Sequence, residues 1–262
     1  MIATDRGWGG PPASLEIGPD EVHVWAAQLC ELGLNSIQWL ALNREERQRA
    51  ARMRSRQGRH GFAAGRALLR MLLATYTGTP AANVRIGYGP FGKPVLHEPD
   101  GGPRLTFNAS RSQGLALYAF AVGREVGVDV ERLQPSFPCD EVAQHYFSLT
   151  ERIRLSKLSD PRLTRTFFTY WSAKEALLKA RGDGLSGGLN DIDVHQLEEA
   201  DETVSTQRTS RVWTVRRLEA RPGYAAAVAF EGTDATLRCW DLNLGGLQPW
   251  TSGSRGVATV LS

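Results

Sequence analysis

One short segment constrains the fold of this chain most: Gly127-Val128-Asp129-Val130-Glu131, whose side chains alternate strictly between two kinds. Successive residues of a β-strand point to opposite faces, so the pattern predicts a strand with valines on one face and acids on the other. Asp129 and Glu131 would repel each other on their shared face. Two interpretations follow: a solvent-facing edge strand with two harmless acids, or a site for a cation.

A second segment follows about forty residues later and has the pattern of a helix: Trp171-Ser172-Ala173-Lys174-Glu175-Ala176-Leu177-Leu178-Lys179. Glu175 and Lys179 share a helix face, where an ion pair between them would contribute about 0.2–0.5 kcal/mol. Together with the strand, however, the helix places three carboxylates and a lysine on two rigid elements. Such a set suits a hard cation with a phosphate-bearing ligand, because Mg2+ prefers oxygen ligands and keeps substrate phosphates in its shell.

The two segments together resemble the paired signature of the 4′-phosphopantetheinyl transferases: Gly-Val-Asp-Val-Glu, then Trp-Ser-Ala-Lys-Glu-Ala-x-x-Lys. The chain length resembles the surfactin-synthetase-activating type rather than the short, trimeric holo-acyl-carrier-protein synthase type. The resemblance implies an enzyme that moves the phosphopantetheine arm of coenzyme A to a serine of an apo acyl or peptidyl carrier protein, leaving adenosine 3′,5′-bisphosphate. It also implies an α+β fold, a pseudo-dimer of two similar α+β halves with the active site between them.

The resemblance further implies which residues bind metal and coenzyme A. Asp129, Glu131 and Glu175 would hold Mg2+, which would bind the coenzyme A diphosphate and polarise the reacting phosphorus. Lys179 would face the diphosphate as both a catalytic and a binding residue. Lys174, which precedes Glu175 in the sequence, is also expected to contact coenzyme A.

A base for the incoming serine proton would assist the transfer. The segment Phe147-Ser148-Leu149-Thr150-Glu151 matches the Phe-Ser-x-x-Glu segment of the family, whose glutamate is a proposed base. The resemblance therefore implies a catalytic role for Glu151. The other interpretation is an acid in the first turn of a helix, where it complements the helix dipole.

A third segment departs from the family pattern at one position. Phe107-Asn108-Ala109-Ser110-Arg111-Ser112 resembles Phe-Asn-x-Ser-His-Ser, whose serine and histidine contact coenzyme A phosphates. The histidine position is Arg111 here. Arginine can still clamp a phosphate, and its charge does not change with pH over the useful range. We therefore expect Ser110 and Arg111 to bind coenzyme A, Arg111 by electrostatics alone.

Two further features concern the nucleotide end of the ligand. Gly92-Lys93-Pro94 matches the family's Gly-Lys-Pro near the adenine, so the resemblance implies that Lys93 and Pro94 contact coenzyme A. Without the resemblance, the segment is interpreted as a tight turn with an exposed lysine. Residues 44–70 are rich in arginine, which indicates either a solvated helix face or a binding site for a polyanion. By the resemblance, two of them, Arg49 and Arg52, align roughly with basic residues that reach the 3′-phosphate.

Two rival functions remain. A nucleic-acid-binding module built on the arginine-rich helix would bind in a salt-dependent manner and would not need Asp129 or Glu175. The sequence has no recognisable nucleic-acid motif, so we expect no nucleic-acid partner. An inactive relative would bind coenzyme A without transferring its arm; the intact carboxylate set disfavours this and the Arg111 departure favours it.

The chain divides into four parts. Residues 1–20 are rich in glycine and proline and are expected to be flexible, residues 21–125 form an N-terminal half, and residues 126–233 form a C-terminal half with the metal segments. Residues 234–262 are an extension with no recognised counterpart in the family. The order of expected elements in the first half recurs in the second at a shift of about 107 residues, which suggests a repeat.

Composition limits the remaining possibilities. The 262 residues are 42% hydrophobic and 23% charged with a formal charge of +3, values of an ordinary globular protein whose basic surface suits an acidic carrier. No apolar stretch approaches a membrane span, and the start lacks the order of a signal peptide, so we expect no membrane partner. Three scattered cysteines fit a reducing cytoplasm. Fused halves would make the protein a monomer.

Overall fold

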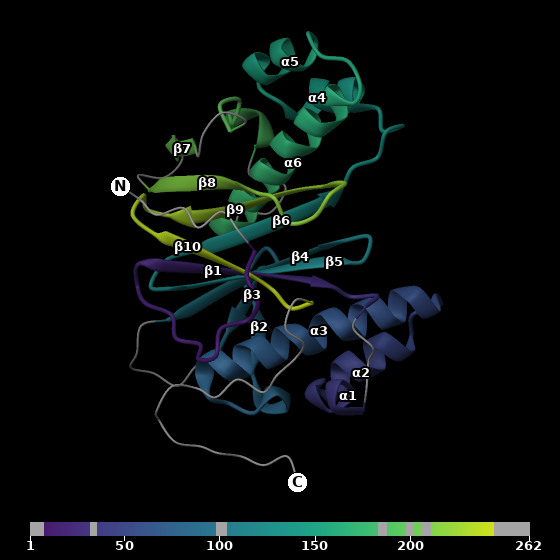
Figure 1. Cartoon of the computed structure of the whole chain (residues 1–262), viewed down its shortest axis with the longest axis vertical. Coiled ribbons are helices and arrows are strands. Elements are labelled where there is room, and N and C mark those ends of the chain that lie inside the picture. Colours follow the sequence, from purple (N-terminus) through teal and green to yellow (C-terminus); the bar gives the residue numbers. More distant parts are fainter. Residues whose placement is uncertain are drawn as a thin grey trace.

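The computed structural model describes residues 8–31, 36–97, 104–182, 188–197, 202–205 and 211–243, with the backbone alone for 36–38 and 202–205. Within these ranges the protein is α+β, with two four-stranded β-sheets stacked between two groups of helices (Figure 1) and a small two-stranded sheet, β2-β3. The apolar stripe of each helix group covers the outer face of one sheet, which is the usual way that a domain buries both kinds of surface.

The first half has its four-stranded sheet in the order β10-β1-β5-β4. The segment Asn43-Arg44-Glu45-Glu46 has the pattern of a helix start, and Asn43 and Glu46 form a reciprocal capping box at α2. The apolar spacing of residues 61–77, which end before Gly78, predicts a helix; it is the larger part of α3, which begins earlier and ends at the left-handed Gly78. The elements are β1 (Glu21–Gln28), α1 (Ser36–Ala41), α2 (Arg44–Ala51), α3 (Arg56–Thr77), η1 (Ala81–Asn83), β2 (Ile86–Tyr88), β3 (Pro94–Leu96), β4 (Leu105–Ser112) and β5 (Leu115–Val122).

The second half has its sheet in the order β6-β9-β8-β7. A second capping box, between Ser148 and Glu151, begins α5, and the left-handed Gly182 ends α6. Among the helices described, including the long α3 and α6, none combines the length and the apolar character of a membrane span. The elements are β6 (Val126–Arg132), α4 (Cys139–Tyr146), α5 (Leu149–Leu155), α6 (Arg162–Arg181), η3 (Leu189–Asp191), β7 (Glu202–Ser205), β8 (Val212–Leu218) and β9 (Tyr224–Glu231).

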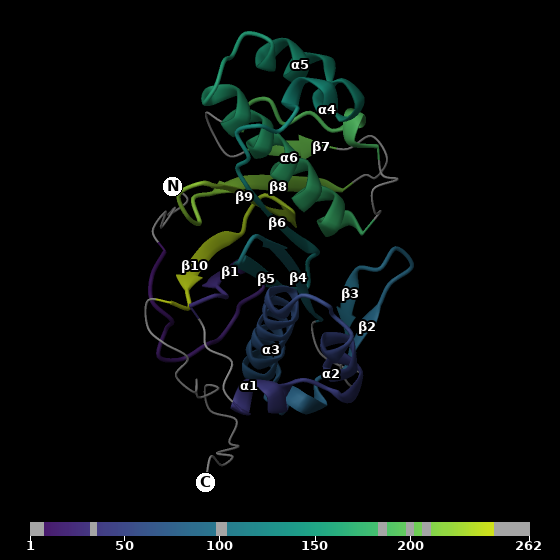
Figure 2. The same ribbon diagram turned by 90° about the vertical axis from the view of Figure 1, so that its right-hand side faces the viewer.

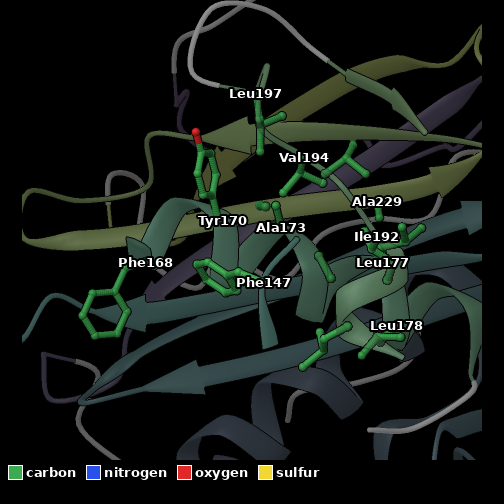
Figure 3. Packing of buried hydrophobic residues seen from close by; sticks show 14 of the residues in the cluster. Phe147, Phe168, Tyr170, Ala173, Leu177, Leu178, Ile192, Val194, Leu197 and Ala229 are labelled. Atoms are coloured by element: carbon green, nitrogen blue, oxygen red, sulfur yellow. The ribbon is translucent and has the colours of Figure 1, made fainter. Parts of the chain in front are cut away.

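The apolar core lies in three layers. Between the sheets, the valines of β6 pack with residues of β1, β5 and β9, so the strand 127–131 is buried on its valine side as expected. Outside the second sheet, α6 contributes Tyr170, Ala173 and Leu177 to a cluster with Phe147 and Ala229 (Figure 3). Outside the first sheet lies α3 (Figure 2). Its leucines form a cluster with residues of that sheet.

The described part of the C-terminal extension belongs to the first sheet. β10 (Thr236–Asp241) pairs in parallel with β1, and Leu242 after it is fully buried. Residues 8–20, which were expected to be flexible, contact the body instead, with Leu15 4% exposed and Gly9 bridged to Trp240. An unpaired strand edge exposes backbone polar groups, and β10 removes that edge from β1. Trp250, in the same expected extension, lies outside the described residues.

Candidate active site

The acidic strand β6 lies beside β4, the edge strand of the first sheet, and side chains join the two edges. Oδ1 of Asn108 accepts a hydrogen bond from the Val128 amide at 3.1 Å, and Oγ of Ser112 accepts one from the Arg132 amide at 3.1 Å. The alternating polar face of β4 is visible in the sequence, but the sequence alone predicts no role for Asn108 or Ser112. The junction places Ser110 and Ser112 directly against the acids of β6.

Gly127 explains how α6 approaches the acidic face of β6. A Cβ at this position would lie 2.1 Å from the carbonyl oxygen of Ala176 and 2.3 Å from the amide nitrogen of Ala180. Both are backbone atoms, so only glycine permits this contact between strand and helix. The contact brings the face of α6 that carries Glu175 and Lys179 over the acids of β6. We call the place where Asp129, Glu131, Glu175 and Lys179 meet the carboxylate cleft.

Asp129 is the most buried acid of this cleft, with 2% of its surface exposed. Its Oδ1 accepts hydrogen bonds from Lys179 Nζ at 2.6 Å and from Ser110 Oγ at 2.8 Å. Lys179 also donates to Ser110 at 3.0 Å, so its ion pair reaches across to β6 rather than along the helix to Glu175. Oδ2 of Asp129 is buried without a hydrogen-bond partner, an arrangement that is costly unless a further group binds there.

Glu131 and Glu175 share the cleft with Asp129 and feel its charge. Burial, and then the charge of Asp129, raise the pKa of Glu131. The same two causes raise the pKa of Glu175, with a further contribution from Glu131, while Lys179 acts in the opposite direction. Three carboxylates therefore face one another with a single ammonium among them, and their mutual repulsion is only partly offset.

The residues of this cleft fit a divalent cation chemically. In the part of the chain that the structure describes, no group of three or more His, Cys, Asp or Glu could hold a metal ion in its present arrangement, and Lys179 occupies one oxygen of Asp129. The remaining oxygen of Asp129 is an unsatisfied acceptor, and Glu131 and Glu175 supply the hard oxygen ligands that Mg2+ prefers. A bound cation would relieve the repulsion between the carboxylates, which adds to the effect of burial on the pKa values of Glu131 and Glu175.

Comparison with known proteins identifies the family. The sequence profile described as the 4′-phosphopantetheinyl transferase superfamily matches residues 125–229, which include β6 and α6. The 4′-phosphopantetheinyl transferase HetI of Nostoc sp. is 34% identical over 235 residues, covering 89% of this chain and 97% of HetI. This chain belongs to the 4′-phosphopantetheinyl transferase superfamily.

Other members of the superfamily are more distant. The 4′-phosphopantetheinyl transferase Sfp of Bacillus subtilis is 27% identical over 184 residues, covering 70% of this chain and 80% of Sfp. Among solved structures, a holo-(acyl-carrier-protein) synthase from Bacillus anthracis, in complex with coenzyme A (3′,5′-ADP), aligns with a TM-score of 0.33 and 21% identity. The alignment covers 42% of this chain and 96% of that synthase.

The arginines of this superfamily member fall into two groups. Arg66 and Arg70 both bind Glu46, and Arg70 is 1% exposed, so these two hold α2 and α3 together. Arg49 and Arg52 are exposed, and the Arg49 guanidinium lies 5.1 Å from the ring centroid of Phe62. The two arginines assigned to the 3′-phosphate are therefore among those that can reach a ligand.

Arg111 extends from β4 toward α3. It is exposed, and its Nη1 donates to the carbonyl oxygen of Gly61. It lies next to Ser110 in the strand, but the alternation of β4 points the two side chains to opposite faces. Ser110 thus faces the carboxylates, and Arg111 faces the arginine-bearing helix.

Glu151 and Lys174, expected as the base and a coenzyme A contact, lie elsewhere. Both side chains have no exposed surface, and Lys174 Nζ lies 2.6 Å from Oε2 of Glu151. Glu151 also accepts the Ser148 and Val194 amides at 2.8 and 2.9 Å. Lys174 also donates to the Ile192 carbonyl at 2.7 Å. The structure corrects both assignments: the two residues form a buried structural pair and do not face the cleft.

Lys93 and Pro94 lie in the β2–β3 hairpin. Pro94 begins β3 and is half-buried. Lys93 is not the exposed turn lysine that the segment suggests in isolation, because its ammonium donates to Glu125 and to the carbonyl oxygen of Ala180, each at 2.6 Å. Its side chain is 14% exposed. The structure therefore brings Lys93 to the end of α6 rather than into solvent.

Proposed function

We propose that this protein transfers the 4′-phosphopantetheine arm of coenzyme A to a serine hydroxyl of an apo carrier protein and releases adenosine 3′,5′-bisphosphate. The observation that carries the proposal is the cleft in which Lys179 and Ser110 meet Asp129, whose second oxygen is unsatisfied. A diphosphate is bound by a metal cation together with cationic side chains. This cleft provides carboxylate ligands for a metal cation, and Lys179 is a cationic side chain.

In this proposal Asp129, Glu131 and Glu175 hold Mg2+. When bound, the cation would neutralise the diphosphate and polarise the phosphorus that the serine attacks. With Asp129 committed to the cation, the Lys179 ammonium is directed to a diphosphate oxygen, and the Ser110 hydroxyl is free to donate to another. Arg111, Arg49 and Arg52 are exposed cations for the 3′-phosphate side.

The serine proton needs an acceptor other than Glu151, because both oxygens of Glu151 already accept bonds inside the protein. In this proposal the acceptor is a carboxylate oxygen of Glu131 or Glu175 that does not hold the cation.

We also propose that the two halves are related as a pseudo-dimer, so that a monomer contains a complete site. Each half has a strand, three helices and two closing strands, and the sheet order β1-β5-β4 corresponds to β6-β9-β8. The partner in this proposal is an acidic carrier domain drawn to the exposed arginines. Cys30, Cys139 and Cys239 form no disulfide, which suits a reducing compartment such as the cytoplasm.

The test is the intact mass of apo acyl and peptidyl carrier domains after incubation with the protein, coenzyme A and Mg2+. The expected result is a gain of one phosphopantetheine that is lost with EDTA and with Asp129→Ala. Coenzyme A binding without any gain would favour an inactive relative. Salt-dependent nucleic-acid binding that Asp129→Ala leaves unchanged, again without mass gain, would favour the nucleic-acid module.

A further inference from the structure

The edges of the two large sheets meet at β4 and β6, which lie side by side (Figure 1). The two strands belong to different sheets, so side chains rather than a backbone ladder join them. Asn108, Ser110 and Ser112 are alternate residues of β4, and each forms a hydrogen bond to β6. Alternate residues of a strand share a face, so one face of β4 is directed at the strand that carries the acids.

Ser112 is the member of this face that bonds Glu131. Its hydroxyl donates to Oε2 of Glu131 at 2.9 Å and accepts the amide of Arg132 at 3.1 Å. A hydroxyl has one proton to donate, so its donor capacity is used by the carboxylate. Because Glu131 and Arg132 are consecutive, the backbone of β6 itself fixes the hydroxyl beside the side chain that it bonds.

The turn after β4 fixes Ser112 from the other side. Gln113 and Gly114 have φ values of 39° and 96°, in the left-handed region that tight two-residue hairpin turns require. The carbonyl oxygen of Gln113 accepts a hydrogen bond from the hydroxyl of Tyr224, at the start of β9, at 2.9 Å. The end of β4 is therefore attached to the second half through both Ser112 and Gln113.

Glu131 depends on Ser112 more than Asp129 depends on any one donor. Asp129 accepts from both Lys179 and Ser110, whereas Ser112 is the hydrogen-bond donor to the Glu131 carboxylate in the described part of the chain. A glutamate side chain has several rotatable bonds, and ordering it costs conformational entropy. The Ser112 hydroxyl meets that cost before a cation binds.

We propose that Ser112 is a positioning residue for the cation site. Its hydroxyl holds Oε2 of Glu131, which leaves Oε1 for Mg2+. The proposal rests on the transferase function proposed above, and it gives Ser112 no contact with coenzyme A. Hydrogen bonds from neighbouring side chains orient the carboxylates that bind a metal, and losing one typically costs about 10–100-fold in metal affinity or activity.

The test is the binding of Mn2+, used as a spectroscopic substitute for Mg2+, measured by electron paramagnetic resonance with coenzyme A present and no carrier. Ser112→Ala should weaken Mn2+ binding roughly 10–100-fold. Ser112→Thr keeps the hydroxyl on a side chain that strands accept, and should recover most of the affinity. Ser156→Ala is the matched control, because it removes an exposed serine hydroxyl that donates to the Ile153 carbonyl outside the cleft, and it should bind Mn2+ like the wild type.

A double-variant cycle tests whether Ser112 acts through Glu131. Glu131→Ala removes the carboxylate, so adding Ser112→Ala to it should weaken Mn2+ binding no further. Kinetics give a second readout. The Mg2+ concentration for half-maximal transfer should rise in Ser112→Ala, while the KM for coenzyme A at saturating Mg2+ should change less than about twofold.

Several results would overturn the proposal. They are unchanged Mn2+ affinity in Ser112→Ala, an equal loss of affinity when Ser112→Ala is added to Glu131→Ala, and a wild-type protein that binds no Mn2+. A raised KM for coenzyme A with unchanged Mn2+ affinity would make Ser112 a ligand contact instead. If the wild type binds Mn2+ but modifies no carrier, the transferase proposal fails, while the Mn2+ affinities of the variants still decide the role of Ser112.

Discussion

The ammonium of Lys174 lies 2.6 Å from the carboxylate of Glu151, and neither side chain has exposed surface. Glu175, the next residue of α6, faces the carboxylate cleft instead, where burial, and then the charge of Asp129, raise its pKa. Adjacent residues of one helix thus serve different sides of it: Lys174 joins α6 to the start of α5, and Glu175 lines the cleft. The division follows from the 100° turn between successive helical residues.

Glu151→Gln should lower the free energy of unfolding, and its effect should not be confined to the rate of the reaction. Removing one partner of a buried ion pair leaves the other charge uncompensated, which costs about 3–5 kcal/mol. We expect a clear fall in the midpoint of thermal unfolding for Glu151→Gln and for Lys174→Met. The double variant should lose less than the sum of the two. A Glu151→Gln protein with wild-type stability and no transfer would instead restore Glu151 as the base.

Gly127→Ala should separate β6 from α6. The added Cβ would lie 2.1 Å from one backbone atom of α6 and 2.3 Å from another, and neither can move without moving the helix. We expect loss of carrier modification together with several degrees of lost thermal stability, roughly 2–4 °C for each kcal/mol. Circular dichroism melting and the intact-mass assay measure both.

Gly58→Ala is the matched control for this change, since a Cβ there would come no closer than 3.6 Å to its neighbours. A helical Gly→Ala change stabilises by about 0.4–1 kcal/mol where the site is compatible. If Gly127→Ala behaved like Gly58→Ala, the close approach of strand and helix would not be required.

Glu175→Gln should stabilise the metal-free protein at neutral pH. The pKa of Glu175 is raised from 4.5 in the folded protein, so the folded state holds its proton more tightly than the unfolded state. Its contribution to stability is therefore present below pH 4.5 and is lost as pH rises through the folded pKa. With EDTA present, Glu175→Gln should melt higher than the wild type at pH 7, and the difference should vanish near pH 4.

Added Mg2+ should reverse this order, because a ligand that binds only the folded state stabilises it and Glu175→Gln removes one carboxylate of the proposed site. Glu131→Gln should behave alike, and Glu16→Gln, at an exposed acid, should respond like the wild type. If Glu175→Gln melted at a lower temperature than the wild type in EDTA at pH 7, the raised pKa assigned to Glu175 would be wrong.

A chain that ends at residue 234 should be much less stable than one that ends at Asn243. The longer form keeps β10, which covers the edge of β1, and the buried Leu242. Burying a leucine side chain contributes about 1.5–3 kcal/mol. Both forms lack the same following residues, so their difference in urea midpoint measures β10 and Leu242. Equal midpoints would show that β10 adds nothing to the first sheet.

Short sequence patterns correctly predicted the cap of α2 and the two faces of β6. Asn43 and Glu46 form the cap that their spacing indicates, and Val128 and Val130 face the core while Asp129 and Glu131 do not. β10 escaped prediction because its partner β1 lies more than 200 residues earlier, and no short pattern indicates a pairing at that separation.

The sequence by itself determined the family, the strand and helix that carry the cleft, and the acids Asp129, Glu131 and Glu175, because alternation and helical spacing fix which side chains share a face. Only the tertiary structure decided which charges meet. It paired Lys179 with Asp129, Lys174 with Glu151 and Lys93 with Glu125. Motifs can mark all these lysines as ligand contacts, but a buried ammonium needs an acceptor nearby, and packing alone determines which acceptor that is.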